Sequence, residues 1–342
     1  MRRRHLVLTP LLAALTGALL LASSCGSLPR EEVRRRLLEL PKNEPVAAGL
    51  ETTTLQADLG AGPVELELVH LRVPARNPKP GARPLLLVHG TPSTLCNWAP
   101  VIYGDSEHPG LAEHRDVHAI ELLGHGFAPG SHGPYSFQQL AAFTVAATRA
   151  LGLQGVHLVG HSYGGEVTWR AALDAPELYA TLTLSNSAGY ARADDEWLPE
   201  EEVMRDNPLA DLGWRLNARD RIMTALEPHF VEVPDDTLEE FFLVCENADN
   251  WHAMIDLVRD ENGERQEELG QLSMPVLLLW GERDIAYTLD GVARRFESDI
   301  PGAVLRTVEA GHYPHEERPA DYANLLTGFL DELDEKATTE RP

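Results

Sequence analysis

Cysteine and positive charge are both scarce in this chain of 342 residues. There are three cysteines, Cys25, Cys96 and Cys245, and none stands in a metal-ligand spacing. The 29 Lys and Arg residues face 53 Asp and Glu residues, which leaves a formal net charge of -24. Because nucleic-acid binding depends on cations that neutralise phosphates, this balance argues against DNA or RNA as a partner. The excess of acid we interpret as a source of solubility.

Long hydrophobic runs are also absent, except near the N-terminus. There Arg2 to Arg4 precede an apolar stretch from Leu6 to Leu21, the pattern of an export signal over residues 1–24. Leu21-Ala22-Ser23-Ser24-Cys25 resembles a bacterial lipobox, although its commonest form has leucine where Ala22 stands. We therefore predict a lipid on Cys25 and a protein tethered at the bacterial cell envelope, with periplasmic or secreted protein, or an uncleaved anchor, as alternatives. The N-terminal lipid is the membrane contact that we predict, because no later stretch of the sequence has the length of a membrane-spanning helix.

Cys96 and Cys245 then remain in the folded part. In an oxidising compartment they can form one disulfide. Two buried free thiols fit the sequence as well, because unpaired cysteine is among the most buried residue types. Both alternatives stay open at this point.

The middle of the chain has the pattern of an α/β domain. Residues 64–73 alternate apolar and polar, which predicts an edge hairpin. Helical stretches at 137–151 and 166–173 then lie between short, mainly apolar runs of the kind that forms strands buried on both faces, at 85–88, 117–123, 156–159, 182–184, 276–280 and 304–308. This alternation predicts a doubly wound fold, with a mostly parallel central sheet flanked by helices.

The alternation stops near Ala191 and returns at Met274. The acidic stretch between them has a helical pattern and carries scattered aromatics, namely Trp197, Trp214, Phe241, Phe242 and Trp251. We predict a largely helical cap at 191–270, inserted into a core formed by 51–190 and 271–335 and followed by a tail at 336–342. Residues 25–50 are charged and rich in proline, with one short helical possibility at 31–40, and are predicted to be a spacer.

Gly160-His161-Ser162-Tyr163-Gly164 carries the sharpest chemical signal. A G-x-S-x-G pattern arises by chance about 0.1 times in a chain of this length, so its context decides. Here it follows a strand-like run and precedes a helical stretch, as a nucleophile elbow requires. Glycines on both sides let the backbone pass close to the turn that presents the Ser162 hydroxyl.

A serine nucleophile needs a base and a group that orients the base, in the chain order Ser, Asp or Glu, His. Asp284 and His312 each follow a strand-like run, so they reach the same edge of the sheet as Ser162. Glu282 and His315 are the nearest competitors and lie less directly in the expected loops. Alone, each residue would be an ordinary turn, surface or core residue, and it is their joint order that predicts a catalytic triad.

His89-Gly90-Thr91-Pro92 follows the run at 85–88. A loop in this place donates one backbone N–H to an oxyanion hole, and the residue after the nucleophile donates the other, which nominates Thr91 and Tyr163. Pro92 has no N–H to give. Trp98, a little further on, is a candidate to contact an apolar acyl group, or else packs the core.

Together these motifs resemble the α/β-hydrolase superfamily over roughly residues 60 to 332, in the branch of esterases, epoxide hydrolases, haloalkane dehalogenases and C–C bond hydrolases. Residues 121–126 and the trailing Glu317-Arg318-Pro319 add to the resemblance. Glu121 departs from it, since an aspartate often stands there, which we expect to affect loop bonding alone. Epoxide hydrolases and haloalkane dehalogenases use aspartate at the elbow, so Ser162 argues against both chemistries.

The function expected from the sequence is acyl transfer on a small-molecule carboxylic ester, with no metal and no organic cofactor required. A C–C bond hydrolase, an aminopeptidase or a perhydrolase-like enzyme would carry the same triad. A non-catalytic, lipid-anchored binding protein on the same scaffold is the alternative of a different class.

Overall fold

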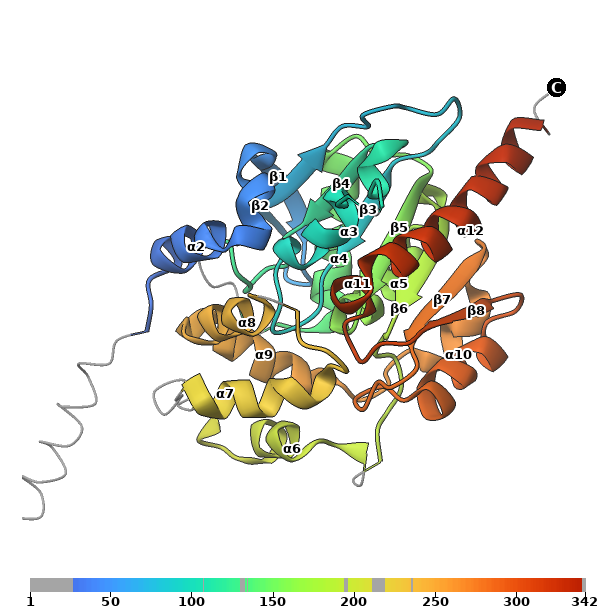
Figure 1. Ribbon diagram of the computed structural model, residues 1–342. Helices are drawn as coiled ribbons and strands as arrows, with labels where there is room; N and C mark the ends of the chain where they lie inside the picture. Colours follow the sequence, from blue (N-terminus) through green and yellow to red (C-terminus); the bar gives the residue numbers. More distant parts are fainter. Residues whose placement is uncertain are drawn as a thin grey trace, which may run out of the picture.

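An eight-stranded sheet runs through the computed structural model, which describes residues 27–339 except 107, 130–132, 134, 194–195, 211–218 and 235 (Figure 1). The strand order is β1-β2-β4-β3-β5-β6-β7-β8, with β1 and β2 antiparallel, β2 antiparallel to β4, and the other neighbours parallel. The strands are β1 (Leu50–Asp58), β2 (Pro63–Val73), β3 (Leu85–Val88), β4 (Val117–Ile120), β5 (Val156–His161), β6 (Tyr179–Ser185), β7 (Val276–Gly281) and β8 (Val304–Val308). The predicted fold class is therefore confirmed.

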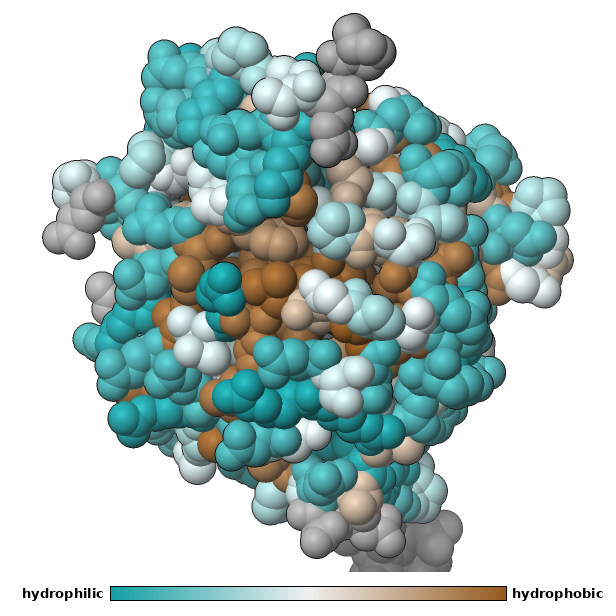
Figure 2. Space-filling model, turned by 90° about the vertical axis from the view of Figure 1, so that its right-hand side faces the viewer, coloured by the Kyte–Doolittle hydropathy of each residue, from teal (hydrophilic) through white to brown (hydrophobic). Residues whose placement is uncertain are grey.

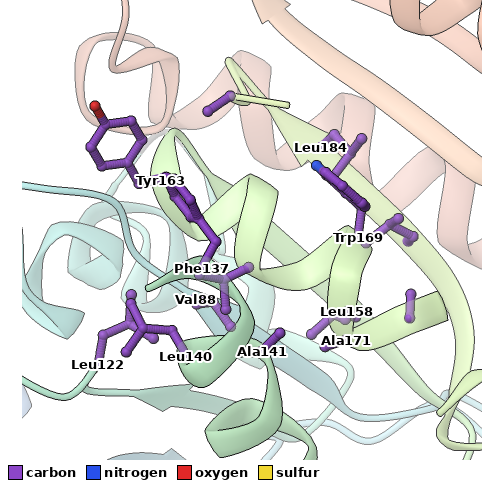
Figure 3. Close-up of a cluster of buried hydrophobic side chains, with 14 of the residues drawn as sticks. Val88, Leu122, Phe137, Leu140, Ala141, Leu158, Tyr163, Trp169, Ala171 and Leu184 are labelled. Atoms are coloured by element: carbon purple, nitrogen blue, oxygen red, sulfur yellow. The ribbon is translucent and has the colours of Figure 1, made fainter. Parts of the chain in front are cut away.

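The central strands are buried on both faces because helices cover both sides of the sheet. In β3, Leu86 and Val88 join one apolar cluster, and Leu85 and Leu87 join the other. Helices α4 (Phe137–Ala150), α5 (Tyr163–Asp174) and α10 (Arg294–Asp299) supply the first cluster, part of which Figure 3 shows. Helices α3 (Ala99–Tyr103) and α12 (Pro319–Thr339) supply the second. This two-sided burial is why these strands have no polar alternation.

Strand β8 ends the sheet, with β7 as its neighbour in the order of strands. Figure 2 shows that apolar side chains gather on the face of the molecule where β8, α10 and α12 lie in Figure 1. Val304 and Leu305 of β8 and Leu325 and Phe329 of α12 are partly buried. The sheet therefore ends in a strand with apolar flanks.

Between β6 and β7 the chain leaves the sheet, and its described residues form four α-helices, which Figure 1 shows gathered at one end of the sheet. They are α6 (Pro199–Asp206), α7 (Arg219–Leu226), α8 (Thr237–Cys245) and α9 (Ala248–Asp260). We call residues 191–270 the insert. Its two ends meet, since a Cβ on Gly263 would lie 2.2 Å from the backbone nitrogen of Ala191. Trp197, Phe241 and Trp251 are buried there, whereas Trp214 lies outside the described residues.

The N-terminal segment differs from the predicted spacer. Helix α2 (Arg30–Glu39) and a 3-10 helix (Pro41–Ala48) pack on the molecule and bury Val33, Leu37 and Val46 completely. The short helical possibility at 31–40 was the correct part of the expectation. The apolar side chains of α2 lie toward α8 and the second cluster, while Glu31, Arg35 and Glu39 on the same helix are exposed to solvent.

A buried cation holds this segment in place. The Lys42 ammonium lies 2.9 Å from Glu240 of α8 and 3.0 Å from Glu316 of α11 (Pro314–Glu317), and both carboxylates are buried. Burial disfavours the charge on Lys42, but the two carboxylates outweigh it and raise its pKa. Lys42 therefore joins the N-terminal segment to the insert and to the core.

Two further expectations concern the N-terminal export signal and the cysteines of the folded part. The predicted signal at 1–24 and the predicted lipid site at Cys25 lie outside the described residues. In the described ranges, no helix combines the length and apolarity needed to cross a bilayer. Cys96 and Cys245 are both buried and do not form a disulfide with each other, which decides between the two alternatives.

Candidate active site

Ser162 stands at a sharp turn between β5 and α5. Its φ of 54° and ψ of -125° are strained for a residue with a Cβ, at a cost of about 1–3 kcal/mol. Hydrogen bonds hold the turn, because the Ser162 N–H donates to the Ser185 carbonyl at 3.0 Å and the Ser162 carbonyl accepts from Ala188 at 3.2 Å. The glycine at 164 is required, since a Cβ there would lie 2.1 Å from the His89 carbonyl oxygen. The local sequence thus fixes the predicted nucleophile geometry.

Asp284 and His312 come together beyond the ends of β7 and β8. Nδ1 of His312 lies 2.8 Å from Oδ2 of Asp284, and both side chains are buried. The same Oδ2 accepts from the Asn186 amide at 2.7 Å, and Oδ1 accepts from the backbone N–H of Ala286 and Tyr287 at 2.8 and 3.1 Å. Burial favours protonation of Asp284, but His312, Asn186 and Tyr287 outweigh it and hold its pKa below the ordinary value.

These bonds also fix the tautomer of His312. An ionised Asp284 can only accept, so Nδ1 of His312 carries the proton and its Nε2 is left as a base. The insert holds the same residue from the other side, because the His312 N–H donates to the His229 carbonyl at 2.7 Å. The imidazole is therefore oriented by the core and by the insert together.

His161 joins the elbow to the His312 loop. Its Nε2 lies 2.8 Å from the carbonyl oxygen of His312, and the two rings are 4.9 Å apart. Burial lowers the pKa of His161 well below its ordinary value, so it donates as a neutral ring. Because β5 and β8 run in the same direction and His161 precedes Ser162, this bond brings the predicted nucleophile and the predicted base to one edge of the sheet.

The loop after β3 lies directly against the elbow. A Cβ on Gly90 would lie 2.6 Å from the Cβ of Ser162, so only glycine fits there. The Thr91 hydroxyl bonds to Nε2 of His125, whose Nδ1 lies 3.0 Å from the Leu123 carbonyl. Across the part of the chain that the structure describes, the backbone N–H groups of Thr91 and Tyr163 donate to no acceptor, which leaves both available for an oxyanion.

Glu121 supports that loop, in line with the expected role in loop bonding. It is fully buried, and its Oε2 accepts from the Leu95 backbone N–H at 3.2 Å. Its Oε1 lies 3.2 Å from Nε2 of His89 but makes no hydrogen bond among the described residues, because that nitrogen accepts from the Leu122 N–H at 3.1 Å. The longer side chain therefore reaches the loop after β3 from the end of β4.

The other candidates have different surroundings. Trp98 is fully buried and packs on His315 and Tyr322, with ring centroids 4.4 and 6.2 Å apart. These contacts give it a packing role, while its predicted contact with substrate stays a prediction. Glu282 accepts from the Thr307 hydroxyl at the surface. Neither competitor is bonded to the His312 ring as Asp284 is.

The sequence reasoning gave no role at the site to three residues that surround it. Asn186 bonds to Asp284, and its position directly after β6, at the same sheet edge, was the available signal. Glu317 accepts from Gly311 at 2.8 Å and from Val231 of the insert at 2.8 Å, so it ties the His312 loop to the insert. Glu261, at the end of α9, is buried, and no pattern in the sequence distinguishes it from the other acids of the insert.

No group of three His, Cys, Asp or Glu side chains within the described ranges has the arrangement of a metal site. The chemistry that the geometry supports is that of a histidine oriented by a carboxylate, at the sheet edge that also carries a strained serine and two backbone donors without acceptors among the described residues.

Known proteins place this arrangement in a family. The profile of the alpha/beta hydrolase family matches residues 85–325, so the chain belongs to that family and is a hydrolase of the alpha/beta fold. The uncharacterized hydrolase YugF of Bacillus subtilis is 26% identical over 271 residues, which cover 73% of this chain and 91% of that protein.

Two solved structures show the same fold. An esterase from Thermogutta terrifontis superposes with a TM-score of 0.68 at 19% identity and covers 83% of this chain and 99% of that one. A bacterial membrane phospholipase A superposes with a TM-score of 0.69 at 26% identity and covers 94% of this chain and 98% of that one. The second comparison therefore extends beyond the range of the family profile.

Proposed function

We propose that the protein is a serine hydrolase that cleaves carboxylic esters by two-step acyl transfer. His312 Nε2 takes the proton of Ser162, and the Ser162 oxygen attacks the ester carbonyl while the N–H groups of Thr91 and Tyr163 bind the oxyanion. His312 then protonates the leaving alcohol, and an acyl-enzyme remains. In the second step His312 activates water, which releases the acid and restores Ser162. The observation that carries this proposal is the Asp284–His312 bond of 2.8 Å at the sheet edge that also presents Ser162.

A more specific candidate substrate is an acyl ester of a membrane lipid. One similar structure, which covers 94% of this chain, is a bacterial membrane phospholipase A, whereas two others are esterases. An apolar acyl group would also suit a site in which Ser162 and His312 are both almost fully enclosed.

Labelling with a fluorophosphonate probe tests the chemistry, and a substrate panel tests the bond. We expect one adduct, on Ser162, and turnover of p-nitrophenyl esters and of diacyl phospholipid in mixed micelles. The panel also contains aminoacyl anilides and a vinylogous diketone. Folded protein with no adduct would favour the binding-protein alternative, and turnover confined to the anilides or the diketone would replace the ester by an amide or a C–C bond.

We further propose that the enzyme is tethered through a lipid on Cys25. Ser27 and Leu28 are fixed to the insert, because the Ala248 N–H donates to the Ser27 hydroxyl at 2.7 Å and the Leu28 N–H donates to the Glu246 carbonyl at 3.0 Å. A lipid on Cys25 would therefore be attached two residues before a segment that the insert holds in place. Globomycin should then cause the precursor to accumulate, and an unchanged precursor with no lipid label would contradict the tether.

A further inference from the structure

One carboxylate of the insert reaches both sides of the candidate active site. Oε2 of Glu261 accepts from the Tyr163 hydroxyl at 2.9 Å, and Oε1 accepts from the Tyr287 hydroxyl at 3.0 Å. Figure 3 shows the Tyr163 ring beside Phe137, with its hydroxyl pointing away from the apolar cluster. The side chains of all three bonded residues are buried.

Each tyrosine belongs to a different part of the proposed chemistry. Tyr163 follows Ser162 and is the proposed oxyanion donor through its backbone N–H. The Tyr287 backbone N–H donates to Oδ1 of Asp284 at 3.1 Å, and the Tyr287 ring lies 5.7 Å from the His312 ring. Glu261 thus connects the donor side of the site to the side that orients the histidine.

The two ends of the insert supply this connection together. Arg192, near the first end, lies 3.5 Å from Oε2 of Glu261 and 2.8 Å from Glu201 of α6. Its guanidinium also covers the Tyr287 ring at 5.5 Å. The charged or titratable groups that face Glu261 are therefore Arg192, Glu201, Tyr163 and Tyr287, with Glu166 and Asp260 further away.

We infer that Glu261 is a positioning residue, which holds Tyr163 and the Asp284 loop in register for turnover when its carboxylate is ionised. This inference rests on the proposed function. An ionised carboxylate accepts both hydroxyls and pairs with Arg192, whereas a protonated one has a donor on one oxygen and loses the charge that Arg192 faces. Burial raises the pKa of Glu261 to about 7, against the opposing effects of Arg192 and the two tyrosines, so the change falls in the range where hydrolases are assayed.

Glu261→Gln tests the inference through a pH profile of p-nitrophenyl butyrate hydrolysis. At pH 8 we expect kcat to fall about 10-fold with little change in KM, because the neutral amide cannot accept both hydroxyls and pair with Arg192. Below pH 6 the deficit should vanish, because the wild-type carboxyl is then protonated as well. A deficit that stays constant with pH, or no deficit at pH 8, would overturn the inference, since a purely structural role predicts an equal loss at each pH.

Two control variants sharpen the result. Glu201→Gln removes a partner of Arg192 and bonds to neither tyrosine, so we expect wild-type kcat at pH 8 and an acid limb shifted to lower pH. Tyr190→Phe removes a hydroxyl that bonds to Asp299 outside this network, at 3.1 Å, and should change neither quantity. If Glu201→Gln reproduced the 10-fold loss, the effect would belong to Arg192 and the inference would fail.

Tyr163→Phe and Tyr287→Phe keep the test decisive if Glu261→Gln does not fold. Each removes one bond and keeps Glu261 ionisable, and we expect about a 3-fold loss of kcat at pH 8 from each. Wild-type kcat in both variants would overturn the inference. Wild-type protein that neither reacts with a fluorophosphonate nor hydrolyses the ester would instead overturn the proposed function, so the two failures are distinguishable.

Discussion

The edge of the sheet and the insert make different contributions to the same site. The sheet edge carries the proposed reactive groups: Ser162, Asp284 and His312 follow β5, β7 and β8, and each is fixed by backbone geometry or by bonds within the core. The insert supplies groups that contact these residues or their neighbours without reacting. They are the His229 carbonyl on His312 and the Glu261 carboxylate on Tyr163 and Tyr287.

This difference suggests that the sheet edge carries out the proposed reaction and that the insert modulates its rate. A change in a reactive group should remove turnover at each pH, because no other group can replace it. A change in the insert should alter turnover by smaller factors that depend on conditions, because it acts on the orientation of groups that remain present. Variants on the two sides of this comparison should therefore differ in size and in pH dependence.

Ser162→Ala should have the largest effect. Loss of the nucleophile removes the acyl-enzyme route, and we expect kcat on p-nitrophenyl butyrate to fall by a factor of about 10⁵ or more. Ser187→Ala is the matched control, since Ser187 also lies at this sheet edge but its hydroxyl donates to the Ala188 carbonyl. Comparable residual rates in the two variants would show that the elbow serine is not the nucleophile.

Asp284→Asn should have the second largest effect on turnover. The amide can present an N–H to Nδ1 of His312, which favours the tautomer whose Nε2 carries the proton, and kcat should fall by about 10⁴. Glu282→Gln provides the comparison, because Glu282 accepts from the Thr307 hydroxyl at the surface and should keep activity within about two-fold. An inactive Glu282→Gln with an active Asp284→Asn would assign the acid to the competitor.

The sequence predicted the core because each of its elements has a local cause. The run at 85–88 matches β3, since a strand buried on both faces must be apolar throughout. The run at 304–308 matches β8, an edge strand that is only partly buried and also carries Arg306 and Thr307. The bond between Asp284 and His312 was expected for a related reason, because parallel strands that end at one edge bring the residues after them together. For Ser162 the sequence supplied the glycines that its strained turn requires.

The contacts that join distant segments could not be predicted in this way. Glu261 is one acid among many in the insert, and only the packing of α9 on the core brings it to Tyr163 and Tyr287. Lys42 lies in a charged stretch rich in proline, and its partners Glu240 and Glu316 are about 200 and 270 residues away in the chain. The spacer was wrong for that reason: the charges and prolines of this stretch carry no sign of which far segment receives it.

Lys42→Met tests whether the N-terminal segment belongs to the fold as much as the core does. The variant leaves Glu240 and Glu316 buried without their cation, and we expect the free energy of unfolding to fall by about 3–5 kcal/mol. Urea unfolding followed by tryptophan fluorescence measures it. Lys79→Met is the matched control, because Lys79 pairs with Asp331 at the surface and should cost less than about 1 kcal/mol. Equal losses of unfolding free energy in the two variants would indicate that the N-terminal segment is a spacer, as the sequence predicted.

The smallest effect we expect is on the pH dependence of stability, and it separates the insert from the core. Since the pKa of Glu261 is raised from 4.5 to about 7 in the folded protein, the folded state binds more protons than the unfolded state between these values. The Glu261 contribution to stability is therefore most favourable below pH 4.5 and is lost as the pH rises to 7, by at most about 3 kcal/mol. The side chain introduced by Glu261→Gln cannot titrate. The free energy of unfolding of this variant, relative to that of the wild type, should therefore rise between pH 4.5 and pH 7 and stay constant above pH 7. A difference that does not change between pH 5 and pH 7 would show that Glu261 is already ionised throughout, and with it that the pH-dependent part of its action on Tyr163 and Tyr287 is absent.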